Sequence, residues 1–271
     1  MTTETNFGSI CAELLTRIRE KHPLIHHMTN FVVMNDTANL TLALGALPVM
    51  AHAKEEVAEM VGAAGALILN PGTLTPEWVE SMLIAGKRAN ELGVPVIYDP
   101  VGVGATTLRN ETGQKFLSTL KIAVVRGNPG ETGYLAGIGG EVKGVESVAD
   151  LKDPVAVAGT FAKAHRLVSA ITAKRDIIAD GNRTLGVDNG HALLKTITGS
   201  GCMSTTAVAA FCAVEPDPLI AAAAALACYG LAAENAAQYS KGPGSFRTAL
   251  LDETYRLTPE DVEKHVRIVE L

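Results

Sequence analysis

Short apolar runs that alternate with longer helical patterns constrain the fold of this chain more than any other feature of its sequence. The runs are "PVM" at 48, "GALILN" at 65, "VPVIYD" at 94, "IAVVRGN" at 122 and "LVSAIT" at 167. Helical patterns separate them, and in the segment 76–93 Pro76 suits a helix start and Gly93 a helix stop. Because the runs are apolar on both faces, they predict an α/β fold with a mostly parallel sheet covered by helices.

The pattern changes after residue 172. The segment "AKRDIIADGNRTLGVDNG" holds two short strand-like pieces around the turn-prone "DGN", which predicts an antiparallel hairpin at the edge of the sheet. The helices expected after it span residues 199–214, 217–238, 245–256 and 259–266. No internal repeat, low-complexity linker or clear boundary divides the sequence, so we expect residues 1–271 to form a single domain.

The charge and hydropathy of the chain limit its partners. The formal net charge is −6, whereas binding to nucleic acid needs a basic face. The longest apolar run, 219–233, is too short and too rich in alanine to span a bilayer comfortably, so it predicts a buried helix. The N-terminus has no basic region followed by an apolar stretch, which a secretory signal would need. We therefore expect neither nucleic acid nor a membrane as partner.

The cysteines and histidines are placed unfavourably for zinc or disulfides. Four cysteines are widely separated and form no C-x-x-C pair, which favours reduced thiols and a cytoplasmic location. His26 and His27 are adjacent, and neighbouring residues on a strand point to opposite faces, so they are not expected to share a metal ion.

Chemically active side chains follow several predicted strands, at the edge where open α/β sheets bind ligands. Asp99 directly follows an apolar run and precedes a glycine-containing loop, although a helix-capping role is also open. Arg126, Asn128 and Glu131 follow the next run and are suited to hold a phosphate and a hydrated Mg²⁺. The N-x-x-E spacing fits a helix capping box equally well. Thr172 offers a hydroxyl at a third strand end.

The segment "TGSGCMSTTAVAAF", residues 198–211, is a glycine-led turn that runs into an apolar helix. Such a turn points several backbone N–H groups at one place, where the helix dipole also favours an anion such as phosphate. Cys202 stands where a phosphoryl-transfer enzyme often has a carboxylate; a small buried hydrophobic residue is the alternative reading. No G-x-x-x-x-G-K-[ST] or complete dinucleotide fingerprint occurs, which disfavours P-loop enzymes and dehydrogenases.

Several motifs in order resemble the hydroxyethylthiazole kinase family of the ribokinase-like superfamily. They are "HHMTNFVVMNDTANLTLALGALPVMA", "DPVGVGAT", "RGNPGE", "NGHALLKTITGSGCMSTTAVAAFCAVEPDP" and "KGPGSF", and the similarity runs from about residue 8 to about residue 265. The resemblance implies a ribokinase-like three-layer α/β/α fold. It also implies phosphorylation of the hydroxyethyl group of 4-methyl-5-(2-hydroxyethyl)thiazole with ATP and Mg²⁺, a salvage step for thiamine. The family further implies a homotrimer with active sites between subunits.

The resemblance also implies roles for individual residues. The residues expected to form the anion hole and carry catalysis are Gly199, Ser200, Gly201 and Cys202. The positions that match substrate contacts are Met50, Asn30 and, again, Gly199. The positions that match ATP contacts are Arg126 and Thr172. The positions that match the residues organising magnesium and phosphate are Asp99, Asn128 and Glu131.

Two of these positions, and the neighbouring Ala173, leave a question open. Local sequence alone favours a core methionine at Met50 and a turn or cap at Asn30. Family members often have glycine where this chain has Ala173, and a methyl group there would crowd the phosphates if the backbone needs a positive φ.

Cys202 raises the question of how a thiol serves phosphoryl transfer. Its ordinary pKa is about 8.5, and a helix N-terminus can lower it enough to allow a thiolate. A loose transition state keeps the proton on the attacking alcohol until late, so a strong base adds little. We expect Cys202 to be a modest proton acceptor, while backbone amides, Arg126 and magnesium supply most of the rate.

Other readings remain open at this point. One is a related kinase of another small alcohol, such as a hydroxymethylpyrimidine or a sugar, and another is a nucleotide-dependent hydrate dehydratase. Both usually carry aspartate in place of Cys202. A non-catalytic homologue would be expected to lack Asp99, Glu131 or the glycine loop, and all are present.

Overall fold

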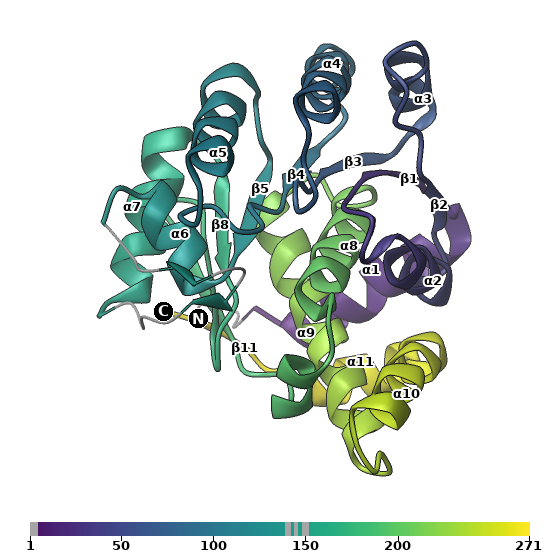
Figure 1. Cartoon of the computed structure of the whole chain (residues 1–271). Helices are drawn as coiled ribbons and strands as arrows, with labels where there is room; N and C mark the ends of the chain where they lie inside the picture. Colours follow the sequence, from purple (N-terminus) through teal and green to yellow (C-terminus); the bar gives the residue numbers. More distant parts are fainter. Residues whose placement is uncertain (1–4, 139–141, 144–145, 148–151) are drawn as a thin grey trace.

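A nine-stranded sheet forms the middle layer of this computed structural model, which describes residues 5–138, 142–143, 146–147 and 152–271. The strand order is β11-β10-β9-β8-β5-β4-β3-β1-β2. Figure 1 shows α3, α4 and α5 in a row along one face of the sheet, with α8 and α9 on the other. The three-layer α/β/α prediction is confirmed.

Most of the sheet is parallel. The parallel strands are β1 (Leu24–Met28), β2 (Leu47–Val49), β3 (Ala66–Leu69), β4 (Val96–Tyr98), β5 (Val124–Gly127) and β8 (Val168–Ile171). The antiparallel strands are β9 (Asp176–Ala179), β10 (Thr184–Val187) and β11 (Ile268–Glu270). The hairpin predicted around "DGN" is therefore confirmed, with Gly181 at φ +91° in its turn. The hairpin is not the outermost pair, however, because β11 adds beyond β10. A separate ladder pairs β6 (Val142–Lys143) with β7 (Glu146–Ser147).

The helices begin and end close to the predicted boundaries. The helices before the hairpin are α1 (Phe7–Lys21), α2 (Met34–Leu44), α3 (Val57–Ala63), α4 (Pro76–Leu92), α5 (Thr107–Thr119), α6 (Pro129–Leu135) and α7 (Pro154–His165). Those after it are the 3₁₀ turn η1 (Ala192–Thr196), α8 (Ser200–Cys212), α9 (Pro218–Ala237), α10 (Pro243–Arg256) and α11 (Pro259–His265). Pro76 occupies the first turn of α4, and Gly93 caps its end at φ +72°, as the sequence predicts.

Side chains of the parallel strands alternate between two apolar cores. Ile68 and Ile97 pack into the core under α1, α8 and α9, whereas Leu69 and Tyr98 pack into the core under α3, α4 and α5. This alternation is what a strand buried on both faces requires. It also leaves the carboxyl ends of β1, β3, β4, β5 and β8 at one edge of the sheet, where the predicted site residues lie.

Helix α9 fills the centre of one core. It is the one helix among the described residues that is long and apolar enough to cross a membrane, but 83% of its most apolar window lies buried inside the fold. Its alanine-rich surface allows close packing: a Cβ atom on Gly230 would lie 2.5 Å from the carbonyl oxygen of Asn189. The prediction of a buried helix is confirmed.

The close approach at Gly230 gives a test of this packing. We expect Gly230→Ala to lower the free energy of unfolding by about 1–3 kcal/mol, because a backbone carbonyl cannot move aside like a flexible side chain. The matched control is Gly159→Ala in α7, where an added Cβ meets nothing within 4 Å and should stabilise the helix by about 0.5–1 kcal/mol. Urea denaturation measures both, and equal effects of the two substitutions would contradict this packing.

Candidate active site

Side chains just beyond the ends of β1, β3 and β4 meet the first turn of α8 in one hydrogen-bonded cluster. Asn30 Nδ2 donates to Asn70 Oδ1 at 3.0 Å, and Asn70 Nδ2 donates to Asp99 Oδ2 at 2.9 Å. The sulfur of Cys202 accepts from Asn70 Nδ2 at 3.1 Å and from Asn30 Nδ2 at 3.6 Å. The structure therefore brings together Asn30, Asp99 and Cys202, which are separated widely in sequence.

The glycine loop supplies free backbone donors at the start of α8. Gly199 has a φ of +80°, and a Cβ atom there would lie 2.7 Å from Val33 Cγ1, so the position requires glycine. The first N–H that bonds within the helix is that of Met203, to the carbonyl of Gly199 at 2.8 Å. The N–H groups of Ser200, Gly201 and Cys202 precede it and have no partner within the helix. This arrangement is suited to an anion.

Arg126 adds a positive charge directly beside this loop. The side chain is largely buried, and its Nη2 donates to Thr172 Oγ1. A Cβ atom on Gly201 would lie 2.7 Å from Arg126 Nη1, so the guanidinium is in contact with the first turn of α8. Within the described part of the chain, Nε of Arg126 is buried without a hydrogen-bond partner. An arginine that retains an unused donor at a helix N-terminus fits a phosphate site.

Asp99 is the most deeply buried acid of the cluster, with 1% of its surface exposed. Its Oδ2 accepts from Asn70 and from Thr205 Oγ1, the latter at 2.9 Å. Its Oδ1 is 3.9 Å from Arg126 Nη1 and receives no hydrogen bond from the described residues. Burial raises the pKa of Asp99, and the Arg126 charge opposes that shift. One carboxylate oxygen is thus left available to a ligand.

Glu131 is buried beside Asp99 and also caps α6. The capping box is complete: Asn128 Oδ1 accepts from the Glu131 N–H at 2.9 Å, and Glu131 Oε2 accepts from the Asn128 N–H at 3.0 Å. Glu131 Oε1 accepts from the Gly102 N–H at 2.9 Å. The capping reading of these residues is therefore confirmed. Burial and the nearby Asp99 charge raise the pKa of Glu131 to about 7.

Cys202 is a protonated thiol in this environment. Burial, followed by the charge of Asp99, raises its pKa to about 12, while the amides of Asn70 and Asn30 and the charge of Arg126 act in the opposite direction. The helix N-terminus therefore does not lower the pKa of Cys202 enough to give a thiolate, because burial and a neighbouring carboxylate outweigh the helix dipole.

The remaining predicted residues have separate places in the fold. Met50 follows β2 and is half-buried. Asn30 also makes the turn predicted from local sequence, since its Oδ1 accepts from the Val32 N–H at 3.1 Å. Thr172 Oγ1 lies against Arg126 at the end of β8. Ala173 is exposed and is not among the described residues with a positive φ, so its methyl group causes no backbone strain.

Sequence reasoning missed Asn70 and Thr205. Asn70 ends the apolar run "GALILN" just as Asp99 ends "VPVIYD", and this parallel is the signal that was present. Thr205 lies one turn after Cys202 on α8. No comparable signal in the sequence indicates that its hydroxyl bonds to Asp99.

Metal ligands in the described residues are few. No group of three or more His, Cys, Asp or Glu side chains there is arranged to hold an ion. The buried histidines of β1 have separate partners, since His26 Nε2 donates to the Ala51 carbonyl and His27 Nε2 to Thr41 Oγ1. Asp99 Oδ1, with no donor, and the neighbouring Glu131 carboxylate are the oxygen ligands that suit Mg²⁺.

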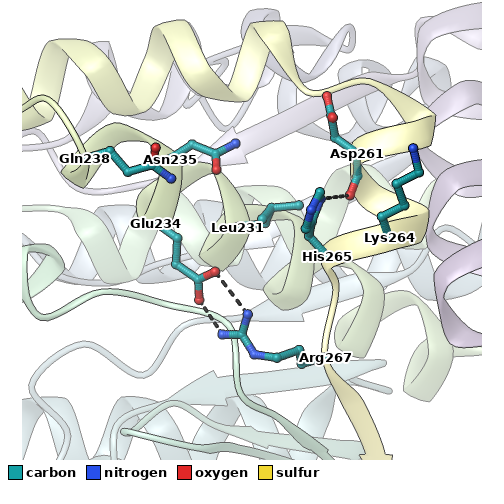
Figure 2. A pocket seen from close by; sticks show the side chains of 8 residues that line it. All are labelled: Leu231, Glu234, Asn235, Gln238, Asp261, Lys264, His265 and Arg267. Atoms are coloured by element: carbon teal, nitrogen blue, oxygen red, sulfur yellow. Dashed lines mark hydrogen bonds and ion pairs between the residues drawn. The ribbon is translucent and has the colours of Figure 1, made fainter.

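A cavity of about 460 Å³ lies elsewhere, beside α9 and α11 (Figure 2). Its lining residues are Leu231, Glu234, Asn235, Gln238, Asp261, Lys264, His265 and Arg267. Glu234 pairs with Arg267 and also accepts from the Gly190 N–H at 2.8 Å. The cavity contains none of the predicted site residues, and the charges of Glu234 and Arg267 on its wall neutralise each other.

Known proteins are similar to this chain in sequence and in fold. The sequence model of the hydroxyethylthiazole kinase family matches residues 15–260. A hydroxyethylthiazole kinase of Chloroflexus aggregans is 58% identical over 265 residues, which are 98% of this chain and 95% of the relative. The structure of a hydroxyethylthiazole kinase protein from Pyrococcus horikoshii OT3 has a TM-score of 0.88 at 41% identity, covering 97% of this chain and 99% of that one. A ribokinase-like superfamily protein from Enterococcus faecalis V583 shares the fold, with a TM-score of 0.64, 13% identity, and coverage of 92% and 95%.

The raised pKa of Glu131 predicts a pH-dependent stability. Between its ordinary value of 4.5 and about 7, the folded protein holds a proton that the unfolded chain releases. The resulting stabilisation is complete below pH 4.5 and is lost as the pH rises through about 7. In that window, the free energy of unfolding of the wild type should fall more steeply than that of Glu131→Gln, by up to about 1.4 kcal/mol per pH unit.

Urea unfolding across this window, without added divalent cation, measures the two slopes. Asp176→Asn is the comparison variant, because burial raises the pKa of Asp176 to about 7 as well and its removal should also flatten the slope. If the free energy of unfolding changes with pH equally in the wild type and in Glu131→Gln, Glu131 is not protonated in this window and the prediction is wrong.

Proposed function

The chain belongs to the hydroxyethylthiazole kinase family, and we propose that its site transfers a phosphoryl group from ATP to the hydroxyethyl group of 4-methyl-5-(2-hydroxyethyl)thiazole. The product is the thiazole phosphate used in thiamine salvage. The observation that carries this proposal is the contact of Cys202 with Asn30 and Asn70, beside a glycine loop that touches Arg126. A neutral alcohol at the sulfur and a phosphate at the loop would be neighbours.

The glycine loop and Arg126 are the proposed phosphate site. The guanidinium touches the turn that carries the N–H groups of residues 200–202, since a Cβ atom on Gly201 would lie 2.7 Å from Arg126 Nη1. Thr172 holds the guanidinium through Nη2, and we assign both residues to ATP. Donors fixed before the reaction stabilise charge that develops on a transferring phosphoryl group, because they need no reorganisation.

Asp99, Glu131 and Asn128 are the residues that would hold Mg²⁺. Asp99 Oδ1 is buried with no hydrogen bond from the described residues, and carboxylate and amide oxygens are ligands that this ion accepts. When bound, Mg²⁺ neutralises charge on the phosphates. Glu131 already accepts two backbone N–H groups, so its carboxylate has a fixed orientation before any ligand arrives.

Cys202 orients the substrate in this proposal. Its thiol is protonated at neutral pH, so it orients the hydroxyl toward the phosphate and does not itself accept the hydroxyl proton, which passes to an oxygen of the transferred phosphoryl group. A loose transition state makes little demand on a base. Met50, Asn30 and Gly199 are the proposed walls of the thiazole pocket, and a mostly apolar pocket suits a neutral ring.

We propose a homotrimer in which a neighbouring subunit covers the outer edge of the sheet. Strand β2 is the last strand at that edge, and Leu47 on it is 46% exposed. Phe31, Val32 and Leu42 are exposed nearby in the chain, on α2 and the loop before it. An uncovered apolar edge strand is an aggregation hazard, which supports a covering partner. Since Phe31 follows Asn30, that partner would border the site.

The free state of all four cysteines supports a cytoplasmic location.

The activity is tested by ADP formation with three mixtures: the thiazole alcohol, hydroxymethylpyrimidine, and no acceptor. We expect turnover to depend on the thiazole alcohol, and Cys202→Ala to lower kcat by about one to three powers of ten, because the phosphate site of the glycine loop and Arg126 remains. Cys202→Asp should retain activity. A preference for hydroxymethylpyrimidine, or ADP formation without acceptor, would favour the other superfamily reactions instead.

The assembly is tested by sedimentation of a variant at the sheet edge. Leu47→Lys places a charge on the proposed contact and should shift the protein from trimer toward monomer, with a parallel loss of activity. Leu92→Lys is the matched control, because Leu92 is 43% exposed at the end of α4 and should leave the trimer intact. A monomeric wild type at micromolar concentration would refute this assembly.

A further inference from the structure

Asn70 contacts Cys202 but has not yet been given a role of its own in the reaction, although it makes four hydrogen bonds within the site. It directly follows β3 and is almost completely buried. Its Oδ1 accepts from Asn30 Nδ2 at 3.0 Å and from the Gly72 N–H at 3.1 Å. Its Nδ2 donates to Asp99 Oδ2 at 2.9 Å and to Cys202 Sγ at 3.1 Å. Both acceptor sites and both N–H groups of the amide are therefore used.

These bonds permit only one orientation of the Asn70 amide. The backbone N–H of Gly72 is a donor only, so it must face Oδ1. A rotation by half a turn would set the NH₂ group against that N–H and would set Oδ1 against the carboxylate of Asp99. Unlike most asparagine side chains, this one has its oxygen and nitrogen assigned by a backbone group.

The turn that fixes the amide is itself held firmly. Arg109, on α5, donates from Nη2 to the Gly72 carbonyl at 2.7 Å and from Nη1 to the Pro71 carbonyl at 3.1 Å. A Cβ atom on Gly72 would lie 2.9 Å from Asn30 Cβ, so the turn also packs against Asn30. A rigid support of this kind transmits a small displacement of Gly72 to Asn70.

The sulfur of Cys202 depends on this amide for its position. A thiol side chain can rotate about its Cα–Cβ bond, and the shorter of its two amide contacts comes from Asn70, at 3.1 Å against 3.6 Å for Asn30. The same Asn70 NH₂ group connects the sulfur to Asp99. Building on the function proposed above, we propose that Asn70 is a positioning residue of phosphoryl transfer, which holds Cys202 Sγ toward the substrate hydroxyl.

Loss of this contact should lower turnover more than substrate affinity. Asn70→Ala leaves Asn30 with its turn contact to Val32, so the proposed thiazole wall keeps one anchor. We expect kcat to fall by about 10- to 100-fold, the size typical of groups that orient a reacting residue, with a smaller change in KM for the alcohol.

A double-mutant cycle with Cys202 tests the proposal. The measured quantity is kcat for the thiazole alcohol in the wild type, Asn70→Ala, Cys202→Ala and the double variant. If Asn70 acts through the sulfur, removing Asn70 should cost less than about threefold when Cys202 is already alanine. A general weakening of the site would cost the same factor in both backgrounds.

Thr205→Val is the matched control. Thr205 donates to the same oxygen of Asp99 as Asn70 does, at the same distance of 2.9 Å, but from the other side of the cluster on α8. The factor by which Thr205→Val lowers kcat should be the same in the wild type and in the Cys202→Ala background. The proposal is supported if the Asn70 substitution is coupled to Cys202 and the Thr205 substitution is not.

A second variant covers the case in which Asn70→Ala fails to fold. Asn70→Ser places no charge beside Asp99 and keeps a hydroxyl, but it loses the NH₂ group that donates to Cys202 Sγ, and its cost in kcat should also shrink when Cys202 is alanine. Equal costs in both backgrounds overturn the role of Asn70 and leave the proposed function intact. A wild type that forms no ADP with the thiazole alcohol overturns both.

Discussion

The contact between the Arg126 guanidinium and the backbone of Gly201 is the constraint on which the site depends. The guanidinium occupies the space that a Cβ atom on Gly201 would need, since such an atom would lie only 2.7 Å from Arg126 Nη1. This contact places a permanent positive charge against the N–H groups of residues 200–202, which have no partner within the helix. Arg126 reaches that place because it lies near the carboxyl end of β5 and because Thr172, at the end of β8, accepts a hydrogen bond from its Nη2. The parallel sheet thus brings the charge to the loop.

The positive end of α8 is balanced by buried acids. Asp99 and Glu131 lie in an environment that raises the pKa of each, and the charge of Asp99 adds to the shift of Glu131. Such burial opposes folding and is typical of sites that await a charged ligand. Neutral amides and hydroxyls, rather than further charges, complete the cluster: Asn70 and Thr205 both donate to Asp99 Oδ2. The thiol of Cys202 belongs to this neutral set, which suits a substrate without charge.

Sequence pattern predicted the parts of this structure that depend on local composition. Apolar strands, proline at helix starts and Gly93 at a helix end act within a few residues, so β3, β4 and α4 follow from them. Strand β11 has no such pattern, because its three residues pair with β10 only after the chain has returned from α11. Asp99, Arg126 and Cys202 were predicted because each stands at a strand end or helix start. Asn70 stands in the same kind of place, but asparagine there also fits an ordinary turn, and its role depends on partners up to 132 residues away. The sequence left the protonation state of Cys202 open, because the burial of its thiol and the nearby Asp99 charge are properties of the folded chain.

The most direct measurement of the central claim is a crystal structure of the complex with ADP, aluminium fluoride and the thiazole alcohol. We expect the fluoride, which stands in for the transferring phosphoryl group, to accept hydrogen bonds from the N–H groups of Gly201 and Cys202 and from Arg126, with the alcohol oxygen beside Cys202 Sγ. A fluoride group bound away from the first turn of α8, or an alcohol bound away from the sulfur, would contradict it.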